Sequence, residues 1–207
     1  LDYNAGGARY NNTYVQFVGL GTLTDSFSAI RQMSFEPGNG SLPLAEFVAA
    51  LDKNFASGET LHQRLLHKTR KYGNDDDYAD EIMVRIFDTC FDELDGRPDH
   101  KGGRYRIEML PTTCHVYFGS VTGATPDGRL AGLPVSEGIS PVQGADRHGP
   151  TAVIRSASKM DHLKAGGTLL NMKFAPSLVA AEDGVDKWAH LVRSYCKMDG
   201  HHIQFNV

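Results

Sequence analysis

Cys114 and His115 are neighbouring residues with the chemistry of a thiol nucleophile and its general base. Residues 113–119 are expected to form a short extended segment. Neighbours on a strand point to opposite faces, so the thiol and the imidazole are not expected to hydrogen-bond to each other. The favoured interpretation is a buried thiol beside a structural histidine.

Three further polar segments fit metal or phosphate binding poorly. His201 and His202 are adjacent and lack ligand spacing, and no Cys-x-x-Cys or His-x-x-x-His accompanies them. The aspartates at 75–77 lack the later Gly and Glu of an EF-hand, and residues 119–129 lack the Gly-Lys-Ser/Thr ending of a P-loop. A helix start and a turn explain these two segments better. Local chemistry therefore predicts no catalytic residue and no metal site.

Periodic apolar positions divide the chain into the elements that must position any site. Expected strands cover 13–20, 105–110, 113–119, 151–154, 168–174 and 202–207, and expected helices cover 25–33, 44–55, 59–71, 75 to about 95 and 185–198. A turn is expected at 36–40. Because strands alternate with helices, the fold class is α/β.

Two of these helices have well-defined apolar faces. In the helix that begins at the three aspartates, the expected buried stripe is Tyr78, Ile82, Ile86, Cys90 and Leu94, widened by Met83, Phe87 and Phe91. In the helix over 185–198, the residues expected to face inward are Val185, Trp188, Leu191, Val192 and Tyr195. Residues 120–150 are too long for a simple connector, and loops of this length are usually functional or packed on themselves.

Composition excludes several classes of protein. The chain has 207 residues, of which 41% are hydrophobic, and a formal net charge of -4, which gives no basic field for nucleic acid or an anionic membrane. No apolar run approaches the roughly 20 residues that span a bilayer, and the N-terminus does not resemble a signal peptide. The three widely spaced cysteines read as reduced thiols. A cytoplasmic location is expected.

The two ends indicate a piece of a larger domain. The chain starts at Leu1 without Met, and it stops at Val207 within an alternating pattern that includes Ile203 and Phe205. Residues 1–207 are therefore expected to be one partial domain that is truncated on both sides.

Long stretches of the sequence resemble the glycyl radical enzymes of the pyruvate formate-lyase superfamily, most of all the hydroxyproline and glycerol dehydratases. The stretches that carry this resemblance are GGARYNN at 6–12, LGTLTDS at 20–26, PTTCHVYFG at 111–119, TGATPDGRLAGLPVSEGISPVQG at 122–144, SASKMDH at 156–162 and GHHIQFN at 200–206. The resemblance covers nearly the whole chain and is weakest between about residues 40 and 100.

The resemblance implies a radical mechanism whose central residues lie outside this chain. In that family a glycine in an Arg-Val-x-Gly-Tyr-like segment stores a backbone radical, and a cysteine in a Gly-Cys-x-Glu-like loop relays it to the substrate as a thiyl. Neither motif occurs in these 207 residues, and neither Cys90 nor Cys114 matches the thiyl loop. The chain alone is therefore expected to be inactive. A radical S-adenosylmethionine activating enzyme and a homodimeric parent protein are further implications.

The resemblance also implies a ten-stranded β/α barrel, of which this chain would form part of the C-terminal half. It places residues 105–113 against the substrate cavity, where Tyr105, Met109 and Thr112 are the candidate substrate-binding residues. Thr112 would act through its hydroxyl and Met109 through its shape, although filling the core is an alternative role for both. The acid and base for a departing hydroxyl stay unassigned among His115, Glu108 and Asp127.

Three hypotheses about function stay open. The first is a dehydratase that acts on hydroxyproline, glycerol or another small diol-like molecule. The second is a formate acetyltransferase or another C–C or C–N lyase of the same superfamily. The third is a noncatalytic binding subunit that completes or regulates a partner.

Overall fold

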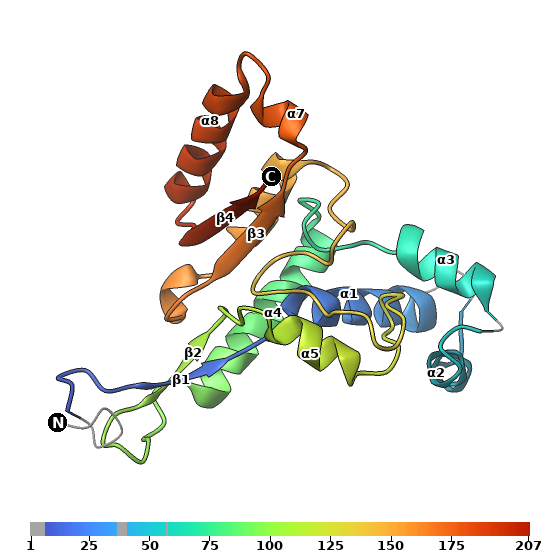
Figure 1. Cartoon of the computed structure of the whole chain (residues 1–207). Coiled ribbons are helices and arrows are strands. Elements are labelled where there is room, and N and C mark those ends of the chain that lie inside the picture. The colour runs from blue at the N-terminus through green and yellow to red at the C-terminus, as the bar shows by residue number, and fades with distance from the viewer. Residues whose placement is uncertain (1–6, 37–40, 57) are drawn as a thin grey trace.

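The computed structural model describes residues 7–36, 41–56 and 58–207, and its strands form two parallel pairs (Figure 1). Strand β1 (Thr13–Gln16) pairs with β2 (Tyr105–Glu108), and β3 (Leu169–Lys173) pairs with β4 (His202–Asn206). A parallel bridge between Met109 and Thr168 joins the two pairs. Helices connect these parallel strands, so the predicted α/β class is confirmed. The turn expected at 36–40 lies almost wholly outside the described residues.

The helices before β2 form the first half of the molecule. Helix α1 (Leu20–Ile30) continues into a π-helical turn (Arg31–Phe35) and is followed by α2 (Leu44–Asp52), α3 (Glu59–His67) and α4 (Asp77–Leu94). Helix α4 packs against α1 and β2. A second half contains α6 (Pro150–Ala157), a 3-10 turn (His162–Lys164), α7 (Pro176–Val179) and α8 (Gly184–Lys197).

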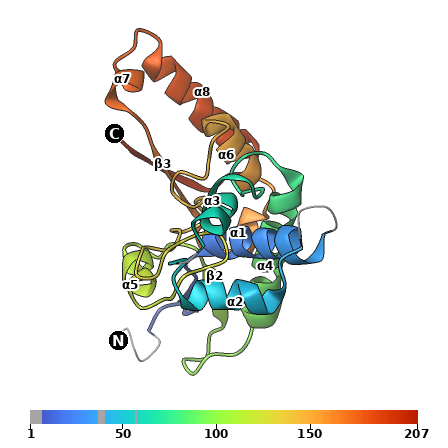
Figure 2. The same cartoon turned by 90° about the vertical axis from the view of Figure 1, so that its right-hand side faces the viewer.

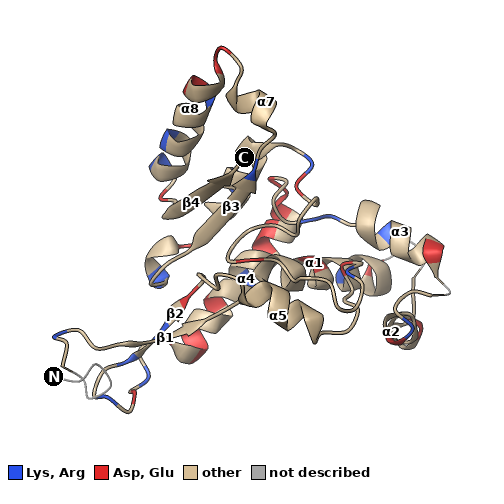
Figure 3. Ribbon diagram, in the orientation of Figure 1, with Lys and Arg blue, Asp and Glu red and all other residues tan. Residues whose placement is uncertain are grey.

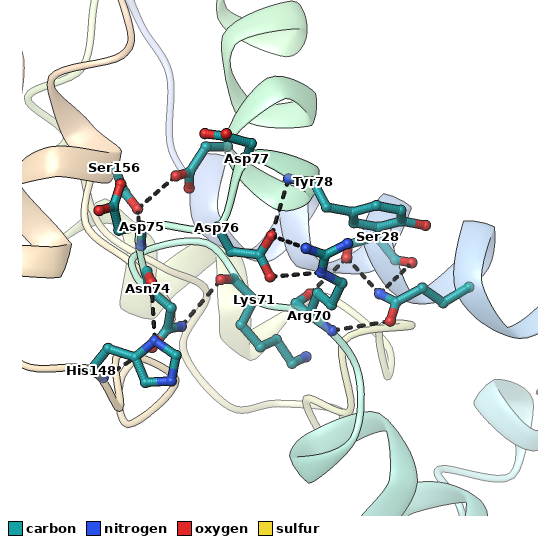
Figure 4. A network of polar contacts seen from close by, with 12 residues as sticks. Ser28, Arg70, Lys71, Asn74, Asp75, Asp76, Asp77, Tyr78, His148 and Ser156 are labelled. Atoms are coloured by element: carbon teal, nitrogen blue, oxygen red, sulfur yellow. Dashed lines mark hydrogen bonds and ion pairs between the residues drawn. The ribbon is translucent and has the colours of Figure 1, made fainter.

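The predicted start of α4 is confirmed. Asp76 precedes the helix, and its Oδ1 accepts a hydrogen bond of 3.1 Å from the backbone N–H of Tyr78, which satisfies one free donor of the first turn (Figure 4). The buried line of the helix differs from the predicted stripe, because Ala79, Met83 and Phe87 lie at its centre. Those three positions are four residues apart and face α1 and β2, so the predicted stripe forms one flank of the contact.

The first turn of α8 corrects one predicted core residue. Leu191 and Tyr195 are buried as expected, but the side chain of Val185 is 69% exposed. Gly184 takes the inward position instead, because a Cβ atom there would lie 2.5 Å from the carbonyl oxygens of Leu178 and Val179 in α7. The next residue is turned by about 100° around the helix axis and points away from α7.

Two predicted strands are helices. Residues 113–119 belong largely to α5 (Cys114–Ser120), and residues 151–154 lie within α6. Pro111 and the left-handed backbone of Thr112 (φ 49°) end the extended path of β2 and turn the chain into α5. Pro150 occupies the start of α6, where its missing N–H costs nothing. Strand-forming composition is thus overridden at both places by the residues that precede it.

The long loop packs on itself, as its length predicted. Residues 121–149 contain no helix or strand. The guanidinium of Arg129, which is 6% exposed, donates hydrogen bonds to the carbonyl oxygens of Thr122, Gly123, Leu130 and Leu133. These bonds hold residues 122–123 and 130–133, which flank the turn around Arg129, to one buried side chain.

Candidate active-site face

The strands have one face covered by α4 and the other helices of the main core, and one face that those helices leave open. Ile107 and Met109 are 0% and 1% exposed and join the core formed with Met83 and Phe87 of α4. Successive side chains on a strand point to opposite faces, so Arg106 and Glu108 point the other way. We define the open face by the residues on the uncovered side of the four strands: Tyr14, Gln16, Arg106, Glu108, Leu169, Asn171, Lys173, His202, Gln204 and Asn206. Polar side chains dominate this face.

Glu108 lies on the open face at the carboxyl end of β2. Its Oε2 accepts a hydrogen bond of 3.2 Å from the side-chain amide of Gln16, the residue beside it on β1. Ligands of parallel α/β sheets bind at the carboxyl ends of the strands. The position and the chemistry of this carboxylate therefore both fit a functional site.

A segment of the long loop takes the place of β2 where that strand ends. The N–H of Phe17 donates to Glu108 O at 2.8 Å, but the N–H of Gly19 donates to Ser136 O at 3.0 Å. On the other side, the N–H of Ile139 donates to Leu169 O at 3.0 Å. The segment from Ser136 to Ser140, which we call the inserted segment, therefore lies between the continuation of β1 and strand β3.

Gly138 allows the inserted segment to fit. A Cβ atom on Gly138 would lie 2.3 Å from Leu169 O, and the residue has a positive φ of 49°. The left-handed backbone also separates the neighbouring side chains. Ile139 is 0% exposed in the core, whereas Glu137 faces α5.

Helix α5 brings His115 to Glu137. Figure 2 shows α5 and α4 on opposite sides of β2, so α5 lies on the side of the open face. His115 Nε2 is 3.9 Å from Glu137 Oε2, and the N–H of Val135 donates to His115 O at 3.2 Å. The other ring nitrogen of His115, Nδ1, is buried and has no hydrogen-bond partner among the described residues. At 3.9 Å the imidazole and the carboxylate lie within ion-pair distance but beyond direct hydrogen-bond reach, so a proton would pass between them through one bridging water.

Asp127, which the sequence left open as an acid or base, has a structural role. It is 2% exposed, and its Oδ1 accepts hydrogen bonds from the hydroxyl of Thr125 at 2.5 Å and the N–H of Arg129 at 3.3 Å. Its backbone carbonyl also accepts a bond of 2.7 Å from Lys71 Nζ. These contacts hold the loop to the first half of the molecule.

The three predicted substrate-binding residues occupy three different environments. Tyr105 is half-buried at the start of β2, and Met109 is buried in the core on the side of α4. Thr112 is exposed at the turn into α5. The structure therefore does not gather these three side chains, and their role in binding stays a prediction.

Sequence reasoning left Glu108 without an assigned role and did not identify Glu137. The alternation of Arg106 and Glu108 with Ile107 and Met109 could have placed Glu108 on the polar face of β2. No local signal marks Glu137, because its position depends on the inserted segment. Among the described residues, no group of three or more His, Cys, Asp and Glu side chains is placed to hold a metal ion. No helix in the described ranges is long and apolar enough to cross a membrane.

Fold and face together define an α/β protein whose parallel strands present polar and ionisable side chains on one open side. A model of the pyruvate formate lyase-like family matches residues 1–119, and a glycine radical model matches residues 135–207. The chain belongs to the pyruvate formate lyase-like family.

Several relatives match nearly the whole chain. Trans-4-hydroxy-L-proline dehydratase of Clostridioides difficile is 57% identical over 206 residues, which are 100% of this chain and 26% of that protein, and its substrate-bound crystal structure superposes with a TM-score of 0.94. Isethionate sulfite-lyase of Bilophila wadsworthia is 39% identical over 95% of this chain and 24% of its own length. The glycerol-bound glycerol dehydratase of Clostridium butyricum has a TM-score of 0.91 at 38% identity, covering 98% of this chain and 26% of that one. The chain thus spans about a quarter of the length of these relatives.

Proposed function

We propose that this chain is part of a glycyl radical lyase, and more narrowly of a dehydratase that removes water from a small hydroxylated molecule such as hydroxyproline or a diol. The observation that carries the proposal is the glycine radical match over residues 135–207 together with 57% identity to a hydroxyproline dehydratase. The relative named as a sulfite-lyase supports the wider class of lyases. We further propose that the four parallel strands belong to one half of a ten-stranded β/α barrel.

The open face is the side that would line the barrel interior, because helices cover the opposite side. A glycyl radical, relayed through a cysteine thiyl, supplies hydrogen-atom abstraction when both are present. Both residues are proposed to lie outside these 207 residues, so this chain by itself would be inactive. Asn171 offers an observation that fits a neighbouring segment on this face. Its Oδ1 is buried without a partner among the described residues, so it can accept a hydrogen bond from a donor brought by another part of the protein.

Roles in substrate binding are proposed for Thr112, Met109 and Tyr105. The hydroxyl of Thr112 is accessible at the end of β2, beside α5. Met109 would act indirectly, since its buried side chain sets the packing behind the face. A radical S-adenosylmethionine activating enzyme and a homodimer are the proposed partners, in a cytoplasmic protein.

An anaerobic activity assay of the complete gene product tests this function. The protein would be activated with a radical S-adenosylmethionine enzyme, the glycyl radical measured by electron paramagnetic resonance, and products quantified with 4-hydroxyproline, glycerol, 1,2-propanediol and isethionate. We expect the radical signal and water loss from one hydroxylated substrate. Release of sulfite from isethionate without dehydration would favour the lyase alternative. A radical signal that never forms would refute the proposal.

A further inference from the structure

We propose that His115 and Glu137 form a proton relay for the dehydration. This inference rests on the proposed function. It concerns a pair that no motif marks, formed by α5 and the inserted segment. The two side chains are 18% and 35% exposed, and His115 Nε2 lies 3.9 Å from Glu137 Oε2.

The hydrogen bonding of His115 distinguishes it from a structural histidine of the same chain. His162 is 3% exposed and uses both ring nitrogens, with Nδ1 2.7 Å from Thr168 Oγ1 and Nε2 3.0 Å from Ala157 O. His115 has its Nε2 directed to a carboxylate and its Nδ1 buried without a partner among the described residues. A relay needs one nitrogen to receive a proton and another to pass it on, and only His115 of these two has that freedom.

The local backbone is built to hold this pair. Val135 N–H binds His115 O, so α5 is tied directly to the residue two positions before Glu137. Gly138 then turns Glu137 toward α5 while Ile139 enters the core. Other titratable side chains on the adjoining elements are Tyr105, Arg106 and Glu108 on β2 and Cys114 and Tyr117 on α5. Among the described residues, Glu137 is the carboxylate within ion-pair distance of His115.

Dehydration moves protons without consuming them. The C–O bond breaks with its electron pair going to oxygen, and that oxygen takes up one proton to leave as water. The substrate loses one O–H or N–H proton as the product gains a C=O or C=N bond, and the hydrogen atom abstracted at the start is returned at the end. A His–Glu pair can carry a proton between these two positions, and no added oxidant or reductant is required.

The test uses amide substitutions in the complete, activated enzyme. His115→Gln and Glu137→Gln keep polar groups of similar size between α5 and the inserted segment, but neither amide can carry a proton. His190→Gln on α8 and Glu59→Gln on α3 are matched controls, because both residues are exposed and far along the chain from this region. The measurements are kcat and KM against pH, with the glycyl radical content determined in each preparation.

We expect kcat to fall on the order of 100-fold or more in both amide variants, with normal radical content, a KM near that of the wild type and a flattened pH profile. Glu137→Asp should recover part of the rate. The controls should behave as the wild type. Variants that retain kcat within about threefold, or that lose the radical signal, would overturn the relay, because either result indicates a structural contact. A wild-type enzyme that holds the radical but dehydrates nothing would instead remove the proposed function itself.

Discussion

Asp25 in α1 should make the stability of this protein fall as the pH rises toward neutrality. Its carboxyl group is 0% exposed, and burial raises its pKa from 3.8 to about 7 against the opposing effects of Lys71 and the N–H of Tyr72. Lys71 Nζ lies 4.0 Å from Asp25 Oδ2, and Tyr72 N–H donates to Oδ1 at 2.8 Å. The folded state therefore binds a proton between these two pKa values that the unfolded chain releases.

The sign and size of the effect follow from proton linkage. Stability from protonated Asp25 is fully present below pH 3.8 and is lost as the pH rises through 7. A difference of about three pKa units corresponds to about 4 kcal/mol. Asp25→Asn keeps an acceptor for Tyr72 N–H and cannot ionise. The free energy of unfolding of this variant, relative to the wild type, should therefore rise by up to about 4 kcal/mol between pH 4 and pH 8.

Urea unfolding of both proteins across that pH range measures this difference. Asp52→Asn is the control for the substitution itself, because Asp52 is exposed at the end of α2. A difference between Asp25→Asn and the wild type that stays flat, or that moves in favour of the wild type as the pH rises, would refute the reasoning.

Three further predictions concern the loop and the buried histidine. Gly138→Ala should destabilise the protein by several kcal/mol in chemical unfolding, because the added Cβ atom would clash with Leu169 O. Gly132→Ala should cost only about 1 kcal/mol, since Gly132 also has a positive φ, of 81°, but no atom lies within 4 Å of the added Cβ. Equal costs for the two variants would contradict the close fit of the inserted segment. Arg129→Lys should accelerate amide hydrogen exchange across residues 122–134, since a lysine cannot serve four carbonyls, and unchanged exchange would disprove that role. Burial lowers the pKa of His162, so the stability that its neutral ring contributes is present above pH 6.5 and is lost as the pH falls below that value. In thermal unfolding, His162→Gln should therefore lose less stability at acid pH than the wild type. An equal loss of stability in both proteins would contradict this role of His162.

The sequence predicted elements whose local signals agree with their tertiary setting. Asp76 does cap α4, whose negative residues suit a helix start, and the alternation through β2 marks a strand with two different faces. Helix α5 was missed because Val116, Tyr117 and Phe118 have strand propensity, while the place that a strand would take beside β3 is filled by the inserted segment. Single-sequence reasoning cannot anticipate that competition, since the competing residues lie further along the chain.

The same competition explains why the position of Glu108 could be predicted from the sequence and that of Glu137 could not. Glu108 follows from period-two alternation, as does its pairing with Gln16 once β1 and β2 are neighbours. Glu137 depends on a loop segment that enters the sheet layer, which composition alone describes only as irregular. Acidic side chains are abundant along the exposed sides of α4 (Figure 3), so acidity alone would not have separated Glu137 from solvated carboxylates.

The long loop is best understood as two parts with different duties. Its first part, around Arg129, folds on its own carbonyls and is attached to the first half of the molecule through Lys71 and Asp127. Its second part, the inserted segment, bonds to the continuation of β1 and to β3, so it contributes to the strand layer itself. Shortening the first part should therefore be tolerated better than inserting or deleting a residue between Ser136, which bonds Gly19, and Ile139, which bonds Leu169. A shift by one residue in this segment would exchange the side chains that face the core with those that face the site. The inserted segment thus brings the chain back to the end of β2, where Glu137 lies beside His115.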